Sequence, residues 1–173
     1  MEIRFLGHSC FELVEGDARV LIDPFLSGNP KAAAGADEVE PTHILLTHGH
    51  NDHYGDVEDI AKRTSAQVLA IAEIAGELEE AGVENVSDPN LGGTVKYDWG
   101  WVKLTPAWHT STTPKGQVNV PAGLLVSIDG KVVYHLGDTA LFSDLKSSPV
   151  AATRSMWRSC ASAATTRWTA WTP

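Results

Sequence analysis

The sequence predicts a single domain of mixed α/β class, and three successive patterns predict it. Up to Ile22 the chain alternates apolar and polar residues and turns at Gly16 and Asp17, as the short strands of a β-meander do. Between residues 42 and 82, strand-like runs alternate with segments of helical spacing. After Gly92 the strand pattern returns. A chain of 173 residues with 43% hydrophobic content is long enough to bury one core.

The expected strands are apolar runs bounded by turn residues. The run at 42–47 follows a loop rich in Pro, Gly and Ala at 24–36 and is apolar on both faces, which indicates a buried strand. Asp129 and Gly130 favour a tight hairpin turn. The other strands are expected at residues 2–6, 10–14, 19–22, 67–71, 94–97, 101–105, 122–128 and 131–136.

Two helices are expected in the middle of the chain, because apolar residues there recur every three or four positions. The first presents an apolar face made of Val57, Ile60 and Ala61. The second ends at Gly82 and presents a face made of Ile71, Ile74, Ala75 and Leu78.

The composition limits the classes of partner and of metal ligand that are expected for this protein. A formal charge of −9 and a pI near 5.1 argue against broad binding to nucleic acid or anionic membranes, so a small-molecule substrate is expected. No run approaches the length of a membrane span, and residues 1–5 read as a strand rather than a signal peptide, which predicts a cytoplasmic protein. Cys10 and Cys160 are isolated, so any metal must be bound by His and carboxylates.

The chain changes character at about residue 147. All 22 acidic residues lie in 1–146, whereas 147–173 holds three Arg, three Trp and no acid, Gly, Leu, Ile or Phe. Such a segment offers little to a hydrophobic core. We therefore divide the chain into a domain at 1–146 and a tail at 147–173.

A frameshift accounts for this tail as a hypothesis. Read one base upstream, Met156-Trp157 becomes Val, and the Trp-Thr steps at 168–169 and 171–172 become Asp. The shifted frame allows Asp-Val-Ala-Leu-Leu-Arg-Ile-Gly-Gly-Asn-Tyr-Thr-Met, an apolar strand followed by a Gly-rich loop. An authentic tail of biased composition is the alternative. The encoding DNA decides, because a single clean frame with no second reading would exclude the frameshift.

The strongest functional pattern directly follows the buried strand at 42–47. His48, His50, Asp52 and His53 place three imidazoles and a carboxylate within six residues, a density typical of a metal site. In extended backbone His48 and His50 point to the same side, so both can bind one ion at about 2.0–2.1 Å. Asp52 and His53 can serve a second ion.

Two later residues are weaker candidates. His109 follows the strand at 101–105 and precedes a polar loop, so from the residues alone a ligand role and a structural role are equal alternatives. Asp138 lies in Gly-Asp-Thr after the strand at 131–136, where glycine allows close approach and a carboxylate can bridge two cations. An ordinary turn or helix-capping Asp is the alternative for this position.

The H-x-H-x-D-H pattern resembles the signature of the metallo-β-lactamase superfamily, and the similarity is strongest to an uncharacterised subgroup of metal-dependent hydrolases (UPF0173-like). The similarity spans residues 1 to about 146. Besides the histidine motif, it rests on Gly7-His8-Ser9-Cys10-Phe11, Leu21-Ile22-Asp23-Pro24-Phe25, Pro106-Ala107-Trp108-His109-Thr110 and Gly137-Asp138-Thr139-Ala140-Leu141-Phe142. The resemblance implies an αββα sandwich of two facing, mostly antiparallel sheets, with helices outside and metals at one edge.

The resemblance also implies roles for individual residues. A first ion would be held by His48, His50 and His109, a second by Asp52 and His53, and Asp138 would bridge the two. Asp52 and His53 are the expected catalytic residues. His8 and Asp23 are expected near the site as supporting residues, and Asp23 could hydrogen-bond a ligand histidine. The ions are expected to be zinc, with Mn or Fe as alternatives. His43 and His135 lie in apolar strand patterns and are expected to pack or hydrogen-bond locally.

The chain departs from the family pattern at its C-terminal end. The second ion of the family normally also takes a histidine near the C-terminus, and this chain has none after His135. The sandwich is therefore expected to be incomplete there, without its final helix and strand. Exposed sheet faces would then weaken cooperative folding or favour a homo-oligomer.

Three functions follow as alternatives. The first is a hydrolase that acts on an ester, lactone, amide or phosphodiester bond, because paired divalent ions lower the pKa of a bound water and polarise the substrate oxygen. The second is a metal-binding remnant without turnover. The third is a di-iron redox enzyme on the same fold, although no flavin or rubredoxin-like module accompanies it. Metal content per chain distinguishes the three.

Overall fold

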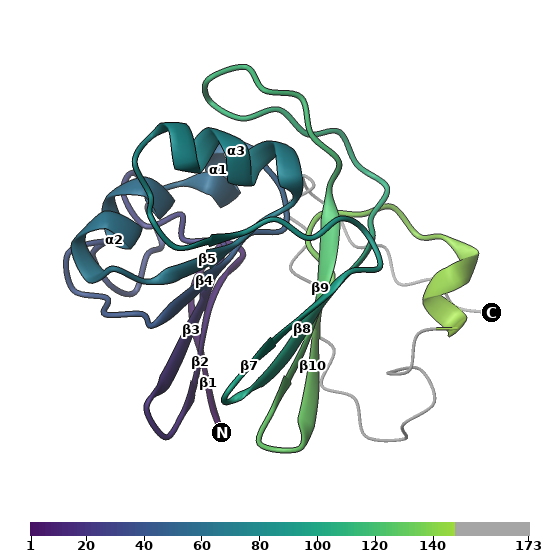
Figure 1. Ribbon diagram of the computed structural model, residues 1–173, viewed down its shortest axis with the longest axis horizontal. Coiled ribbons are helices and arrows are strands. Elements are labelled where there is room, and N and C mark those ends of the chain that lie inside the picture. The colour runs from purple at the N-terminus through teal and green to yellow at the C-terminus, as the bar shows by residue number, and fades with distance from the viewer. Residues whose placement is uncertain (148–173) are drawn as a thin grey trace.

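The computed structural model of the chain describes residues 1–147, which form two facing β-sheets with helices beside the first of them (Figure 1). The tail expected at 147–173 lies, apart from Ser147, outside the described residues, so its origin stays a prediction. Among the described residues, no helix has both the length and the apolar character needed to cross a membrane.

The first sheet has six strands in sequence order, and its pairing changes character at the third. The strands are β1 (Glu2–Gly7), β2 (Cys10–Glu15), β3 (Ala18–Ile22), β4 (His43–Leu45), β5 (Gln67–Leu69) and β6 (Val86–Ser87). β1, β2 and β3 are joined by tight turns and pair antiparallel. β3 to β6 pair parallel, because longer connections return the chain to the same end of the sheet. The expectation of a mostly antiparallel sheet is therefore wrong for this half.

The helices cover the outer side of the first sheet (Figure 1). They are α1 (Asn51–Tyr54), α2 (Val57–Thr64) and α3 (Ala72–Glu80). The faces that the spacing predicts are buried: Val57, Ile60 and Ala61 in α2, and Ile74, Ala75 and Leu78 in α3. Ile71, predicted on the second face, is also buried but lies just before α3 as its N-cap. These helices supply the outer layer that the parallel strands require.

The second sheet has four strands that all pair antiparallel, in the order β10-β9-β8-β7. They are β7 (Thr94–Tyr97), β8 (Gly100–Pro106), β9 (Ala122–Ile128) and β10 (Lys131–His135). Asp129 and Gly130 have φ of 52° and 66°, as the predicted two-residue hairpin turn requires. The short 3-10 helix η1 (Ser143–Ser147) is the last element described.

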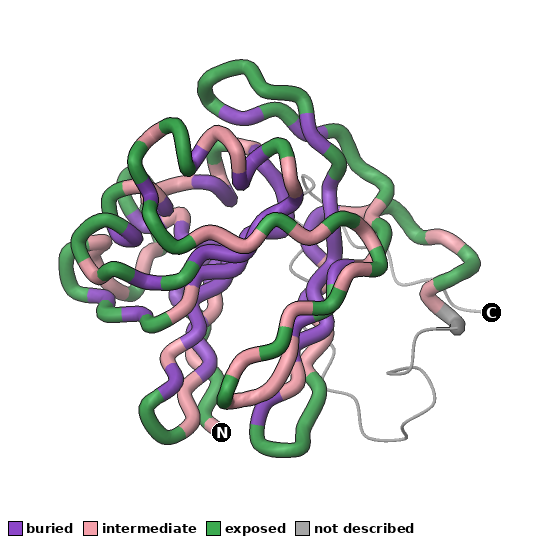
Figure 2. The backbone as a smooth tube through the Cα atoms, viewed as in Figure 1, coloured by how far each residue is buried: buried purple, intermediate pink, exposed green. Residues whose placement is uncertain are grey.

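The core lies between the two sheets and beneath the helices, where the backbone is buried (Figure 2). Leu13 of the first sheet and Leu104, Leu124 and Val126 of the second are completely buried in one continuous cluster. At one edge, the N–H of Ala122 donates to the carbonyl of Thr47 at 2.8 Å, which joins the start of β9 to the end of β4. The loops after β4, β8 and β10 leave the sandwich at this edge.

Candidate metal centre

Five connections carry the residues singled out from the sequence to this edge. His8 lies in the turn between β1 and β2, and Asp23 directly follows β3. The histidine motif follows β4 and continues into α1. His109 and Asp138 follow β8 and β10. Residues far apart in the sequence therefore meet because the strand ends that precede them meet.

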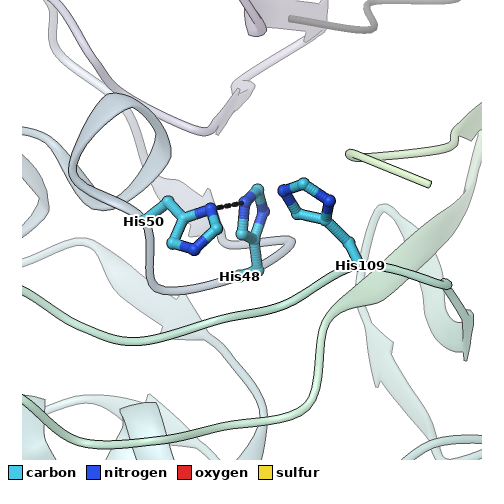
Figure 3. A group of neighbouring side chains, drawn as sticks. All are labelled: His48, His50 and His109. Atoms are coloured by element: carbon cyan, nitrogen blue, oxygen red, sulfur yellow. Dashed lines mark hydrogen bonds between the residues drawn. The ribbon is translucent and has the colours of Figure 1, made fainter. Parts of the chain in front are cut away.

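His48, His50 and His109 form the first group, with their rings turned toward one another (Figure 3). Nε2 of His48 lies 3.1 Å from Nδ1 of His50. The ring centroid of His109 lies 5.3 Å from that of His48 and 5.1 Å from that of His50. Two nitrogen ligands at about 2.0–2.1 Å from a tetrahedral ion are themselves about 3.3 Å apart. The spacing of His48 and His50 matches that geometry.

His8, Asp52 and His53 form a second group, whose ligand atoms all lie within 4.8 Å of one another. Asp52 and His53 are neighbours in the single turn of α1, which presents both side chains at the edge of the first sheet. Asp52 is half exposed, whereas His53 is completely buried. The second group is therefore open toward solvent at Asp52 and, to a smaller extent, at His8, whose side chain is 23% exposed.

Asp138 lies between the two groups. Its Oδ1 is 3.6 Å from Nε2 of His53, and its Oδ2 is 3.6 Å from Nε2 of His109. Each carboxylate oxygen thus faces a different group. This is the arrangement in which one carboxylate can contact two cations.

The centre fits cations because its atoms lack other partners. Nε2 of His8, Nε2 of His53 and Oδ1 of Asp138 are buried and have no hydrogen-bond partner among the described residues. Leaving such polar atoms buried and unpaired costs free energy. Imidazole nitrogens and carboxylate oxygens are ligands for Zn, Mn, Fe and Co. The residues present therefore fit divalent metal ions.

Asp23 holds the centre from beneath. This completely buried carboxylate accepts hydrogen bonds from the backbone N–H of Thr47 at 2.8 Å and from its hydroxyl at 2.7 Å, and it lies 2.8 Å from Nδ1 of His53. Burial acts to raise the pKa of Asp23, but the adjacent His53 outweighs burial and lowers it. With Nδ1–H of His53 directed at Asp23, Nε2 is left facing the site.

The Thr47 hydroxyl fixes the tautomer of His48 in the same way. Its single hydrogen is donated to Asp23, so its oxygen accepts from Nδ1 of His48 at 3.0 Å. The lone pair of His48 then lies on Nε2, toward His50. Burial, reinforced by the charge of His53, lowers the pKa of His48 to about 3 and keeps it neutral. A neutral imidazole is the form that binds a metal.

The electrostatics around His53 favour a cation. Burial alone would lower the pKa of His53, but the carboxylates of Asp23 and Asp138 raise it to about 10. Correspondingly, burial would raise the pKa of Asp138, but His53 lowers it to about 2. Two buried carboxylates therefore stabilise positive charge at the position of Nε2 of His53.

Ser111 and Asn119 also lie at the centre, and no sequence pattern indicates a role for either of them. The hydroxyl of Ser111 accepts the backbone N–H of Gly49 at 2.8 Å and donates to Asn119. Gly49 lies between His48 and His50, so this contact joins the histidine motif to the 110–121 loop that follows His109. A serine in a polar loop has no distinguishing spacing, and only the folded contact reveals it.

The two remaining histidines of the strands lie outside the centre, as the apolar patterns around them predict. His135 is buried, with Nε2 3.1 Å from the carbonyl of Ser9, and its Nδ1 accepts the N–H of Gly137. His43 accepts the indole N–H of Trp99. Neither side chain belongs to the candidate ligand groups.

Comparison with known families decides the assignment of this fold. The family model of the metallo-β-lactamase superfamily matches residues 3–165. The chain belongs to the metallo-β-lactamase superfamily. Within the superfamily it is 47% identical over 147 residues to a UPF0173 metal-dependent hydrolase of Thermus thermophilus. The matched region covers 84% of this chain and 65% of that protein. A UPF0173 metal-dependent hydrolase of Methanopyrus kandleri is also 47% identical, over 150 residues. The chain thus spans about two thirds of the length of these curated relatives.

Solved structures of metallo-β-lactamase type agree with this fold. Igni18, a metallo hydrolase from Ignicoccus hospitalis, superposes with a TM-score of 0.72 at 32% identity, covering 83% of this chain and 63% of that one. CmlA, a diiron β-hydroxylase from Streptomyces venezuelae, superposes with a TM-score of 0.64 at 22% identity, covering 79% of this chain and 29% of that one. The second likeness concerns the fold alone.

Proposed function

We propose that this chain is a hydrolase with a two-ion centre. His48, His50 and His109 would hold the first ion, Asp52 and His53 would hold the second, and Asp138 would bridge them. The observation that carries the proposal is the position of Asp138, whose two oxygens each lie 3.6 Å from a histidine of a different group. Membership in a family of metal-dependent hydrolases supports it.

Zinc is the ion that we propose for both positions, because histidine-rich sets with few carboxylates suit zinc well. Mn and Fe remain alternatives for the carboxylate-containing position. Divalent ions at such a centre supply Lewis acidity, which makes a water molecule acidic and polarises a carbonyl or phosphoryl oxygen. No nucleophilic side chain is then needed.

The protein's own residues orient this chemistry. His48 and His53 are completely buried and form the floor of the centre, while Asp52 and His109 are partly exposed at its mouth. A substrate would therefore approach between Asp52 and His109. Oδ2 of Asp52 is well placed to accept a proton from an attacking water, since this member of the second group is half exposed to solvent. We propose an ester, lactone, amide or phosphodiester as the substrate bond.

Metal analysis joined to a substrate screen tests the proposal. The full chain is loaded with zinc, freed of excess metal, and assayed for bound ions and for hydrolysis of chromogenic esters and phosphodiesters. His48→Ala and Asp52→Ala are expected to abolish hydrolysis. His43→Ala is the matched control, because it removes a half-buried imidazole that belongs to none of the candidate ligand groups. Hydrolysis that persists in both site variants would refute the proposal.

The alternative of a metal-binding remnant gives a different outcome in the same experiment. A remnant would bind one ion through His48, His50 and His109 and would hydrolyse none of the substrates. The absence of histidine after His135 is the observation that favours it. Two bound ions per chain together with turnover would exclude the remnant.

A further inference from the structure

The backbone at His8 is held in an unusual conformation. His8 has φ of 57°, and Gly7 before it has φ of 114°. The pairing of β1 with β2 shifts register between Phe5 and Gly7, directly before this turn. A non-glycine residue at positive φ is uncommon and carries strain that the surrounding structure must sustain. Such strain is typical of positions where a side chain has to point in one direction.

The imidazole of His8 points into the centre. Its ring packs edge-on against Phe25, at a centroid distance of 5.7 Å, and against His53, at 5.3 Å. Nε2 of His8 lies 3.1 Å from Oδ2 of Asp52. Despite this proximity the nitrogen is buried and forms no hydrogen bond within residues 1–147. His8 and Asp52 therefore converge on the same region without satisfying each other.

We propose that His8 is a protein ligand of the second ion. The inference rests on the two-ion function proposed above and adds to it a ligand from the β1–β2 turn. His8, Asp52 and His53 offer three ligand atoms within 4.8 Å of one another, and Nε2 of both histidines has no hydrogen-bond partner in the part of the chain that the structure describes. With Asp138 the second ion would have four protein ligands. The described residues thus complete a shell that the sequence alone leaves one histidine short.

A simple ion pair between His8 and Asp52 is the competing interpretation. An ion pair would form a hydrogen bond between the two side chains, and it would stabilise the metal-free protein. A ligand role instead predicts that removing the His8 imidazole lowers the affinity for the second ion and leaves the stability of the metal-free protein almost unchanged. The two interpretations are therefore separated by comparing metal affinity with stability in the same variant.

The test titrates the metal-free full chain with Co²⁺, following visible absorption and heat of binding. His8→Asn removes the imidazole and keeps a residue type that tolerates positive φ. We expect the first ion to bind as in the wild type and the second to bind at least about tenfold more weakly. Asp52→Asn should affect the same second ion, His50→Asn the first, and His43→Asn neither.

Stability in the presence of a chelator is measured on the same proteins. A thermal midpoint of His8→Asn equal to that of the wild type supports the ligand role. A lowered midpoint with both affinities unchanged would establish the ion pair and overturn the ligand. If His8→Asn binds both ions like the wild type while Asp52→Asn loses the second, only the inference about His8 fails. If the wild type binds no ion, the proposed function itself fails.

A measurement on the wild type covers the case in which His8→Asn does not fold. The chain is loaded with Cu²⁺, exposed to ascorbate and oxygen, and mapped by peptide mass spectrometry for oxidised histidine. His8 is expected to be oxidised together with His48 and His53, while His43 stays intact. An intact His8 beside an oxidised His53 would overturn the proposal.

Discussion

Asp23 and His53 are both completely buried, and Oδ2 of the aspartate lies 2.8 Å from Nδ1 of the histidine. The pair lies beneath the candidate metal centre, and two further hydrogen bonds from Thr47 hold the carboxylate in place. The geometry explains how Asp23 orients the His53 imidazole, with Nδ1 toward the carboxylate and Nε2 toward the candidate metal centre.

Asp23→Asn is expected to weaken binding of the second ion by about 10–100-fold, because His53 loses the carboxylate that orients it. Competition with a chromophoric chelator measures this affinity. Glu12→Gln is the matched control, since Glu12 of β2 is also a buried carboxylate but pairs with Arg4 of β1 at 2.9 Å. Equal losses in the two variants would contradict a specific role of Asp23.

Ser111→Ala should lower the free energy of unfolding by about 1–3 kcal/mol, because the buried N–H of Gly49 loses its acceptor. The substitution should also weaken binding of the first proposed ion, since Gly49 lies between its proposed ligands His48 and His50. Urea unfolding of the metal-free chain gives the first quantity. Ser127→Ala, at a half-buried serine of β9, should be close to neutral. An unchanged unfolding midpoint in Ser111→Ala would show that water replaces the hydroxyl.

Gly49→Ala is expected to damage the centre, whereas Gly76→Ala should stabilise the protein. A Cβ at Gly49 would lie 2.6 Å from Nδ2 of Asn119 and 2.9 Å from Cγ2 of Thr113, so the 110–121 loop would have to move. A Cβ at Gly76 meets nothing within 4 Å, and alanine in a helix is favoured by about 0.5–1 kcal/mol. The thermal midpoints of the two variants should move in opposite directions, and only Gly49→Ala should lower the metal affinity.

Acidification should destabilise the protein in part through His43. Burial lowers the pKa of this histidine in the folded state, so the unfolded chain takes up a proton first as the pH falls. The contribution of His43 is present above about pH 6.5 and is lost as the pH falls toward the folded pKa. Protonation would also remove the acceptor of the Trp99 indole N–H.

His43→Phe isolates this contribution, because it keeps an aromatic ring beside Tyr97 and Trp99 but does not titrate. The fall in the free energy of unfolding between about pH 7.5 and about pH 5.5 should be smaller in the variant than in the wild type. The same fall in both proteins would assign the pH dependence to other histidines.

The sequence predicts the strands well where local signals bound them. β9 (Ala122–Ile128) is predicted to the residue, because Pro121 and the Asp129-Gly130 turn enclose an apolar run. β6 (Val86–Ser87) is too short to show a pattern, and α1 (Asn51–Tyr54) is a single turn inside the histidine motif. The parallel pairing of β3 to β6 depends on long-range contacts, which no local period encodes.

The residues of the candidate centre also differ in how far local sequence predicts them. Spacing alone places His48, His50, Asp52 and His53 together, since they share one segment. His109 and Asp138 could be joined to them only through family resemblance, because their proximity depends on where separate strands end. The orientation of His8 depends on a strained turn, so the sequence offers it only as a neighbour of the site.

His48 and His109 follow strands of different sheets, and the chain between them includes most of the helices. An ion held by both would act as a cross-link that closes a long loop, much as a disulfide does. Its contribution would rise with the logarithm of the free metal concentration c, because an ion that binds only the folded state stabilises it by RT ln(1 + c/Kd). Metal supply would then govern how long the two sheets stay together as well as how fast a substrate turns over.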